Sequence, residues 1–391
     1  MFSATSRPDA ATREKVGFLA DPRHYPHRPR SVKVIETHFA WVFLAGRRAY
    51  KLKKPLRQAS LDYHTLAHRE HICREELRLN RRLAREVYRR VVPLARDRAG
   101  SLTLRQGVVI TDWLVEMRRL PAGRMLDAAL AAGSLRAGDL ERLTARLSEF
   151  FLRRAERRPM SDRAYRARLR RAIWRNEEEL CAPELRVGHR RVVEVTGAQL
   201  DFLARSPRTF AGRGVRLLDG HGDLRPEHVF LGTPSRRACV IDCLEFDARL
   251  RRLDPAEEIA FLALECIRLE APGVADELIA RYRDATDDPA PRALIHFYMS
   301  HRAAIRAQIA AWHLRDEAFA GESRKWRTLA QTYLGDALRH IQEARMLADS
   351  RVDAHGEVKR RAAASARGAA RGARLRSSAA RPRQRAEPSP A

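Results

Sequence analysis

Two aspartates near the middle of the chain are of the kind that acid–base and metal chemistry uses. Asp223 stands in HGDLRPEHVF (residues 221–230), and Asp242 stands in VIDCLEFD (residues 240–247). A glycine and a proline predict a loop around Asp223, whereas Asp242 follows a short apolar run typical of a strand. The pair has two interpretations: a turn with a salt bridge, or the two carboxylates of a metal-dependent reaction.

Phosphoryl transfer is one reaction that needs such a pair. One carboxylate orients or deprotonates the attacking hydroxyl, and a second holds Mg²⁺ against the phosphates. A cation steadies the phosphates, and a further group fixes that cation. Asp223 and Asp242 suit the first two roles. Lys51, in the predicted strand AYKLKK, suits the third, and Glu76, on the apolar face of a predicted helix, suits the fourth.

Two of these assignments have close competitors in the sequence. Lys53 shares a strand face with Lys51 because side chains alternate with period two, and KLKK is also typical of a solvated strand edge. Glu75 competes with Glu76, although it can equally pair with an arginine on the surface. Both alternatives stay open at the level of sequence.

The elements that position these residues form a sheet-rich part followed by a helical part. Residues 31–118 predict a small mixed sheet with one helix. A turn at Ala45–Arg48 separates strands over about His38–Leu44 and Ala49–Lys53. The other expected elements are a helix over 68–88 and strands over 88–96 and 101–120.

The remaining segments complete an α+β chain. Residues 119–348 carry amphipathic helical patterns and the two motifs, and they predict a helical C-terminal lobe with a cleft against the N-terminal lobe. Residues 1–30 predict a loosely ordered lead-in with one short helix over Ala11–Leu19. Residues 349–391 are rich in Ala, Arg, Ser and Pro, and they predict a disordered basic tail.

Composition limits the class of protein. The formal net charge is +27, and residues 351–391 hold eleven Lys or Arg against three Asp or Glu. Most of the arginines predict solvated helix faces, and such a surface attracts polyanions at long range. Five cysteines at irregular spacing predict reduced thiols and a cytoplasmic location. We expect no membrane span and no secretory signal, because no long apolar run occurs.

Taken together, HGDLRPEHVF and VIDCLEF resemble the catalytic loop and metal-binding strand of the aminoglycoside phosphotransferase-like kinases, which share the protein-kinase fold. The stretches ETHFAWVFLAGRRAYKLKKPL and EELRLNRRL resemble the start of a bacterial branch in which the kinase-like part is often fused to a P-loop ATPase domain. The resemblance spans about residues 31–345. No GxxxxGK[ST] motif occurs, so we expect a member of that branch without the ATPase domain.

The resemblance implies a two-lobed protein-kinase-like fold and a set of roles. Asp223 would be the catalytic base, braced by His221, and Asp242 would bind Mg²⁺. Lys51 would contact the α- and β-phosphates of ATP and pair with Glu76.

It also implies roles outside the central motifs. The backbone of Glu116, Met117 and Arg118 would form the hinge that meets adenine. Asp254 would hold the catalytic loop from the following helix.

The chain departs from the family pattern in its metal and phosphate motifs. His228 stands where the family has Asn as a second metal ligand, and an imidazole suits Mg²⁺ poorly. Three readings follow: one metal suffices, Glu245 supplies the missing oxygen, or the metal site is impaired. There is no glycine-rich phosphate loop, since LAGRRA holds a single glycine.

Three functions are therefore weighed. The first is an ATP- and Mg²⁺-dependent phosphotransferase that acts on a hydroxyl of a small molecule. The second is a nucleotide-binding pseudokinase or regulatory module without turnover, and the third is weak polyanion or nucleic-acid binding by the basic tail. Helices such as RAYRARLRRAIWRNEEEL are mixed in charge rather than acidic, so we expect a hydroxylated metabolite rather than a polycationic aminoglycoside as acceptor.

Overall fold

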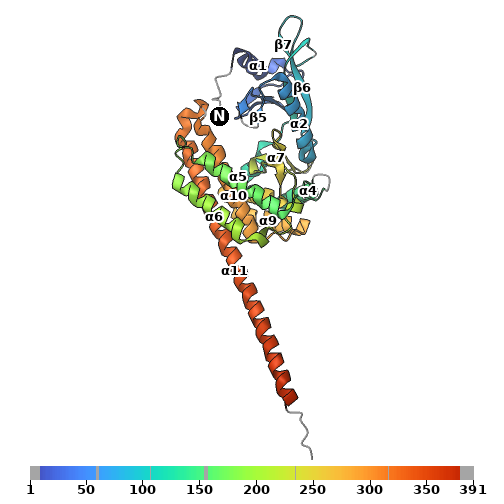
Figure 1. Ribbon diagram of the computed structural model, residues 1–391. Helices are drawn as coiled ribbons and strands as arrows, with labels where there is room; N and C mark the ends of the chain where they lie inside the picture. Colours follow the sequence, from blue (N-terminus) through green and yellow to red (C-terminus); the bar gives the residue numbers. More distant parts are fainter. Residues whose placement is uncertain are drawn as a thin grey trace, which may run out of the picture.

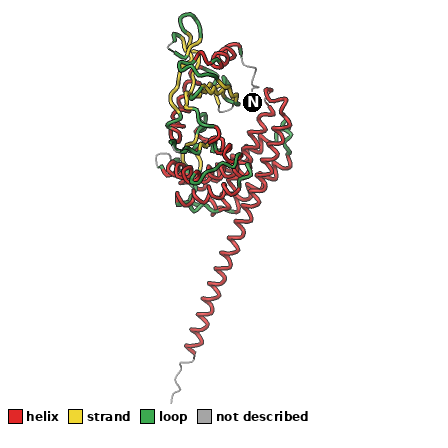
Figure 2. Tube along the Cα trace, turned by 180° about the vertical axis from the view of Figure 1, so that it is seen from behind, coloured by secondary structure: helices red, strands yellow, loops and turns green. Residues whose placement is uncertain are grey.

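The computed structural model shows two lobes, with the strands gathered in one lobe and most helices in the other (Figures 1 and 2). The N-terminal lobe precedes Arg119, and the two sequence motifs lie in the C-terminal lobe. The structure describes residues 9–378 apart from 59–60, 106, 154–156, 234 and 316.

The N-terminal lobe is built on a six-stranded sheet of order β1-β2-β3-β8-β6-β7. All its pairings are antiparallel, which corrects the prediction of a mixed sheet. Short turns join β1 to β2, β2 to β3 and β6 to β7, and a short turn can only bring strands together antiparallel. The strands are β1 (Val32–Glu36), β2 (Ala40–Ala45), β3 (Arg48–Lys53), β6 (Tyr88–Arg96), β7 (Leu102–Thr103) and β8 (Val109–Arg118), with a separate hairpin of β4 (Arg57–Gln58) and β5 (Leu61–Asp62).

The alternation of side chains along β3 decides on which face of the sheet each of them lies. The predicted turn before β3 is present, and Gly46 has a φ of +61° there, in the region that glycine favours. Tyr50 and Leu52 are buried with the helix α1, whereas Ala49 is buried with α2 (Leu66–Ala84) on the other face. Lys51 follows the same alternation as Ala49, so it lies on the α2 face of the sheet.

The segment before the sheet is packed rather than loose. Helix α1 (Ala10–Ala20) lies against β1 and β2, and Leu19 and Tyr25 are fully buried. Lys15 Nζ lies 2.8 Å from Asp112 Oδ2 of β8. The short helix predicted over Ala11–Leu19 is confirmed, but the segment from Ala10 onward is packed on the sheet rather than loosely ordered, and residues 1–8 lie outside the described part.

The C-terminal lobe is mostly helical, as predicted. One large apolar core joins its helices, and α8 and α10 are buried along most of their length. Two-stranded ladders, β9 with β12 and β10 with β11, frame the two motifs. The elements are α3 (Leu126–Ala131), α4 (Asp139–Leu152), α5 (Asp162–Leu180), α6 (His189–Arg205), β9 (Leu218–Asp219), β10 (Val229–Phe230), β11 (Cys239–Val240), α7 (Ala248–Arg251), β12 (Arg252–Leu253), α8 (Pro255–Arg268), α9 (Pro272–Thr286), α10 (Arg292–Trp312) and α11 (Ser323–Ser378).

Helix α11 projects well beyond the body of the C-terminal lobe (Figures 1 and 2). It continues past residue 349, where the sequence suggested that a basic tail begins. Its side chains are described only as far as Ser350, and residues 379–391 lie outside the described part. The extent of the tail and its polyanion contact stay predictions.

Two properties of the described residues bear on the class of protein. Among the described residues, no helix is both long and apolar enough to cross a bilayer. All five cysteines are free thiols, as the irregular spacing predicted, and Cys239 and Cys243 are buried.

Candidate active site

The segment around Asp223 is a loop held at its base by a buried glutamate. Gly222 has a φ of +87°, and the loop continues into a 3-10 turn at Pro226–His228. The Glu258 carboxylate on α8 accepts the backbone N–H groups of His221, at 2.6 Å, and Gly222, at 3.0 Å. Glu258 is fully buried, and burial raises the pKa of its carboxyl group; its two hydrogen bonds fix the loop against the helix.

The His221 ring joins this loop to the segment that carries Asp242. Its Nε2 lies 2.9 Å from the Ile241 carbonyl oxygen, and its Nδ1 lies 3.3 Å from the Asp223 backbone nitrogen. A ring that donates from Nε2 and accepts at Nδ1 is a neutral tautomer. Burial, together with the nearby His228, lowers the pKa of His221 to about 3, so the ring is neutral at pH 7. These are the contacts of a bracing residue.

Asp242 has an unusual backbone conformation that the N-terminal lobe holds in place. Its φ is +62°, in the left-handed region that non-glycine residues rarely adopt. Its backbone N–H donates to the Tyr88 hydroxyl at 3.1 Å, and the next N–H, of Cys243, donates to Asn80 Oδ1 at 2.9 Å. Because Tyr88 begins β6 and Asn80 lies on α2, the N-terminal lobe sets the direction of the Asp242 carboxylate.

Lys51 reaches Asp242 from the opposite lobe. Its Nζ lies 2.5 Å from Asp242 Oδ1 and 3.0 Å from Oε1 of Glu76, which is fully buried on α2. Burial lowers the pKa of Lys51, but Asp242 and Glu76 outweigh that effect and the pKa is raised. Burial likewise raises the pKa of Asp242, but Lys51 and His228 outweigh burial and leave the pKa below its ordinary value. The carboxylate is therefore ionised.

Lys53 lies on the same face as Lys51 but contacts a different acid. Its Nζ lies 2.6 Å from Glu76 Oε2, and it also contacts the Glu245 carboxylate. Glu76 is therefore shared by both lysines, with one oxygen toward each. Among the two lysines, Lys51 is the one in contact with Asp242, which favours it for the phosphate-binding role.

Glu75 lies outside this network. Its carboxylate pairs with Arg78 at 2.8 Å, and that arginine is more than half exposed. Glu76 faces the buried lysines instead, so the geometry favours Glu76 over Glu75 as the partner of the cation.

His228 stands between the two aspartates. Its Nδ1 lies 2.9 Å from the Asp223 carbonyl oxygen and 3.6 Å from Asp223 Oδ2. Its Nε2 lies 3.5 Å from Asp242 Oδ2. The two carboxylates therefore approach one imidazole through different nitrogens.

The Asp223 carboxylate is ionised and forms an ion pair with a neighbouring arginine. Arg225 Nε lies 3.0 Å from Asp223 Oδ1. Burial raises the pKa of Asp223, but Arg225, His228 and Arg306 outweigh burial and leave the pKa lower than its ordinary value. The carboxylate is only partly covered, at 21% exposure, so a small molecule can reach it.

The oxygen donors for a metal ion are few. Asp242 is 41% exposed, whereas Glu245 is nearly buried, contacts Lys53 and accepts the Tyr63 hydroxyl at 2.8 Å. Burial raises the pKa of Glu245, but Lys53 outweighs that effect and lowers it. In the described part of the chain, no group of three or more His, Cys, Asp or Glu is arranged to hold a metal by itself. Asp242 is thus the carboxylate best placed to share an ion with a phosphate.

The predicted hinge residues lie in β8, which is the last of these strands along the chain and lies between β3 and β6 in the sheet. Glu116 and Met117 pair with both β3 and β6, and the Glu116 side chain is buried beside Arg48 at 2.9 Å. The backbone N–H of Arg118 donates to the Val87 carbonyl at 2.8 Å. The chain leaves the sheet after Arg118, so the crossing between the lobes begins where the predicted hinge ends.

The contacts described for Asp254 lie away from the loop around Asp223, which corrects the expectation that Asp254 holds this loop. It caps α8, pairs with Arg213 and accepts the Tyr298 hydroxyl at 2.7 Å. Glu258 lies one helical turn further along α8 and performs the holding role instead. The sequence DPAEE contains this glutamate, but only the packing of α8 shows which of its acids faces the loop.

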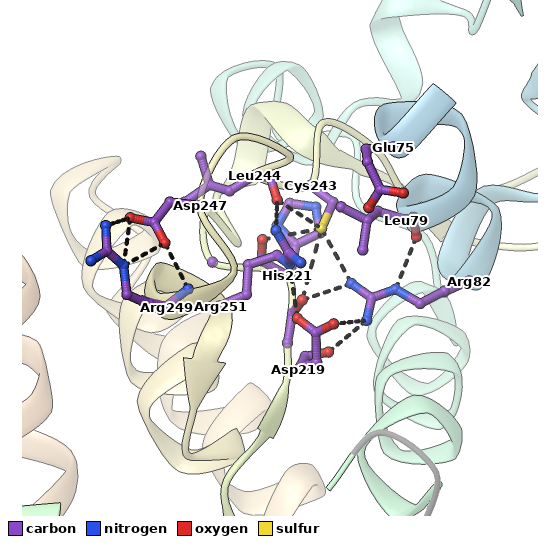
Figure 3. Close-up of polar contacts among 12 residues, drawn as sticks. Glu75, Leu79, Arg82, Asp219, His221, Cys243, Leu244, Asp247, Arg249 and Arg251 are labelled. Atoms are coloured by element: carbon purple, nitrogen blue, oxygen red, sulfur yellow. Dashed lines mark hydrogen bonds and ion pairs between the residues drawn. The ribbon is translucent and has the colours of Figure 1, made fainter. Parts of the chain in front are cut away.

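Arg82 is a further link that the motifs alone did not indicate (Figure 3). From α2 it donates to the Asp219 carbonyl at 2.6 Å and the Gly220 carbonyl at 2.8 Å, and it lies 3.3 Å from Cys243 Sγ. The same side chain therefore contacts the residues before His221 and the residue after Asp242. It ties the helix that carries Glu76 to both motifs.

The connection between β1 and β2 also approaches the segment after Asp242. It consists of Thr37, His38 and Phe39, and the Phe39 ring lies 6.1 Å from the Phe246 ring. The LAGRRA stretch, with its single glycine, forms the turn between β2 and β3.

The geometry matches known proteins at the level of the fold. Over 81% of this chain and 98% of the other, the structure resembles the phosphotransferase APH(2'')-IIIa, solved with GDP and kanamycin, with a TM-score of 0.50 and 13% identity. A choline/ethanolamine kinase family protein from Mesorhizobium loti aligns with a TM-score of 0.47 and 15% identity, over 85% of this chain and 99% of that one. The chain therefore has the two-lobed protein-kinase-like fold that the sequence predicted.

The sequence comparisons leave function open. An uncharacterized protein of Mycobacterium tuberculosis and one of Mycobacterium bovis are each 32% identical over 283 residues, which is 71% of this chain and 54% of theirs. The chain spans about half the length of these curated relatives. No family model matches the chain.

Proposed function

We propose that this protein is an ATP- and Mg²⁺-dependent phosphotransferase that acts on a hydroxyl of a small molecule. The observation that carries the proposal is that Asp223 and Asp242 both approach His228, while Lys51 contacts Asp242 from the other lobe. Two ionised carboxylates and a buried cation, drawn from both lobes, are the groups that phosphoryl transfer requires. At 13% identity, the likeness to a phosphotransferase supports the fold alone.

The roles follow from exposure and charge. Asp223 is ionised and reachable, so it accepts the proton of the acceptor hydroxyl while the oxygen bonds to the γ-phosphorus and ADP leaves. Lys51, held by Glu76, contacts the phosphates, and the neutral His221 keeps the loop in place. The products are a phosphate ester and ADP. The adenine contact expected near Glu116–Arg118 belongs at the Arg118 end, where the chain leaves the sheet.

Asp242 fits Mg²⁺ better than its neighbours do. Mg²⁺ is usually held by one or two carboxylates together with substrate phosphates, and Asp242 offers a carboxylate that is 41% exposed. The ion would neutralise phosphate charge there. His228 offers a nitrogen donor, which Mg²⁺ disfavours, and Glu245 is already engaged by Lys53.

The test is ADP formation across a library of hydroxylated metabolites that also contains aminoglycosides. Once an acceptor is found, Asp223→Asn should lower the rate about 10²- to 10⁴-fold, because the base is lost. Asp242→Asn should lower the rate and raise the Mg²⁺ requirement. Asp284→Asn, at an exposed position on α9, is the matched control and should leave turnover unchanged. Undiminished turnover in both active-site variants would show that these roles are misassigned.

A nucleotide-binding module without turnover is the second candidate, and the position of His228 favours it. The imidazole lies where a second oxygen ligand is expected, and its Nδ1 bonds the Asp223 backbone. ATP should then raise the unfolding temperature equally with Mg²⁺ and with EDTA. Under the phosphotransferase proposal the stabilisation depends on Mg²⁺, and His228→Asn preserves or strengthens that dependence.

A further inference from the structure

A second concave site lies at the junction of the lobes and is lined mainly by arginines. The cavity has a volume of about 760 Å³, within the usual range for small-molecule sites. Its lining does not include Asp223, Asp242 or Lys51. The arginines that line it are Arg47, Arg48, Arg89, Arg118, Arg119 and Arg236.

The positive charge of this cavity is only partly compensated. Glu116 lies 2.9 Å from Arg48 and 3.7 Å from Arg89, and it also pairs with Arg90 outside the cavity. Among the described residues, the other four lining arginines, which are Arg47, Arg118, Arg119 and Arg236, have no carboxylate within ion-pair distance. Several guanidinium groups around one hollow repel one another, and a bound anion removes that repulsion.

The chemistry of the lining selects the kind of anion. Guanidinium groups present planar pairs of N–H donors that match phosphate oxygens, and they stay charged at any ordinary pH. A single monovalent ion cannot neutralise four uncompensated arginines. A compound with two or more phosphate groups fits both the charge and the volume.

The arginines come from both lobes. Arg47 and Arg48 lie at the turn between β2 and β3, and Arg89 lies near the start of β6. Arg118 and Arg119 lie where the chain leaves the sheet, and Arg236 lies between β10 and β11 of the C-terminal lobe. An anion held between these groups therefore links the two lobes at the crossing.

We propose that this arginine-lined cavity binds a small multivalent phosphate compound and that the bound anion holds the two lobes together. The cavity borders the adenine contact proposed above at Arg118, but its lining does not include Asp223, Asp242 or Lys51, and its existence does not rest on phosphotransfer. Its occupancy stabilises the folded protein, because ligand that binds only the folded state raises its free energy of unfolding.

The experiment is calorimetric titration of the full chain with inorganic tripolyphosphate at constant ionic strength, with citrate and a short DNA duplex as comparison ligands. Wild type should bind one tripolyphosphate and gain unfolding temperature. Arg119→Gln combined with Arg236→Gln should weaken binding about 100-fold, from about tenfold per charge-assisted contact. The control is Arg190→Gln combined with Arg208→Gln, which removes the same charge from exposed positions elsewhere and should change affinity less than about threefold.

Four outcomes overturn the proposal. They are no saturable binding, an equal loss in the control variant, citrate binding as tightly as tripolyphosphate, and DNA binding that depends on the same two arginines and displaces tripolyphosphate. Equal loss would mean attraction by the overall charge of +27. If the Gln variant fails to fold, Arg119→Lys with Arg236→Lys replaces it. Lysine keeps the charge but not the paired donors, so tripolyphosphate should still bind more weakly than to wild type.

Discussion

Replacing Glu76 by Gln tests the buried charge network independently of any substrate. Glu76 is fully buried and divides its two oxygens between Lys51, at 3.0 Å, and Lys53, at 2.6 Å. The change removes one negative charge and keeps the size of the side chain. Lys51 then retains Asp242, and Lys53 retains Glu245, so each lysine keeps a single acidic partner.

The expected cost is large because the network is buried. The change weakens two buried charge-assisted contacts, each worth about 1.5–3 kcal/mol, so a total cost of about 3–5 kcal/mol is expected. Glu75→Gln on the same helix is the matched control, because Glu75 pairs with a largely exposed Arg78. An exposed pair is worth about 0–1 kcal/mol.

Urea unfolding of the two variants measures this difference. With a urea dependence of about 3 kcal/mol per molar, Glu76→Gln should lower the unfolding midpoint by on the order of 1 M. Glu75→Gln should lower it by less than about 0.3 M. Equal shifts for the two variants, or no shift for Glu76→Gln, would refute the reasoning that a shared buried carboxylate supports both lysines.

Three more predictions concern the backbone, the loop anchor and pH. Asp242→Ala should be about 1 kcal/mol less stable than Asp242→Gly, because only glycine adopts the positive φ without strain, and equal unfolding midpoints would contradict this. Glu258→Ala should lose about 3 kcal/mol or more, since the buried backbone N–H groups of His221 and Gly222 both lose their acceptor, whereas Glu277→Ala at an exposed position should lose less than about 1 kcal/mol in the same denaturation assay. Burial lowers the pKa of His301 from 6.5 to about 3, so the unfolded chain takes up a proton below about pH 6.5 that the folded chain refuses. The free energy of unfolding therefore falls as pH drops from about 6.5 towards 3, by about 1.4 kcal/mol per pH unit for this histidine. His301→Gln should reduce the slope of unfolding free energy against pH by that amount, and an unchanged slope would contradict the prediction.

The sequence by itself determined the fold class and the two motifs that lie at its centre. Alternation in AYKLKK placed Lys51 and Lys53 on one face of a strand, and periodicity placed Glu76 on the apolar face of a helix. These are local properties, because the side-chain period of a strand or helix follows from its backbone geometry. The turn at Gly46 and the helical lobe followed from the same kind of signal.

Only the tertiary structure decided which of several similar side chains meet. Lys51 rather than Lys53 contacts Asp242, and Glu258 rather than Asp254 holds the catalytic loop, although each pair is close in sequence. The sheet proved antiparallel throughout, and six arginines from distant segments gathered around one cavity. Contacts between residues far apart in the chain depend on how whole elements pack, and the local periodicity of a sequence carries no record of that packing.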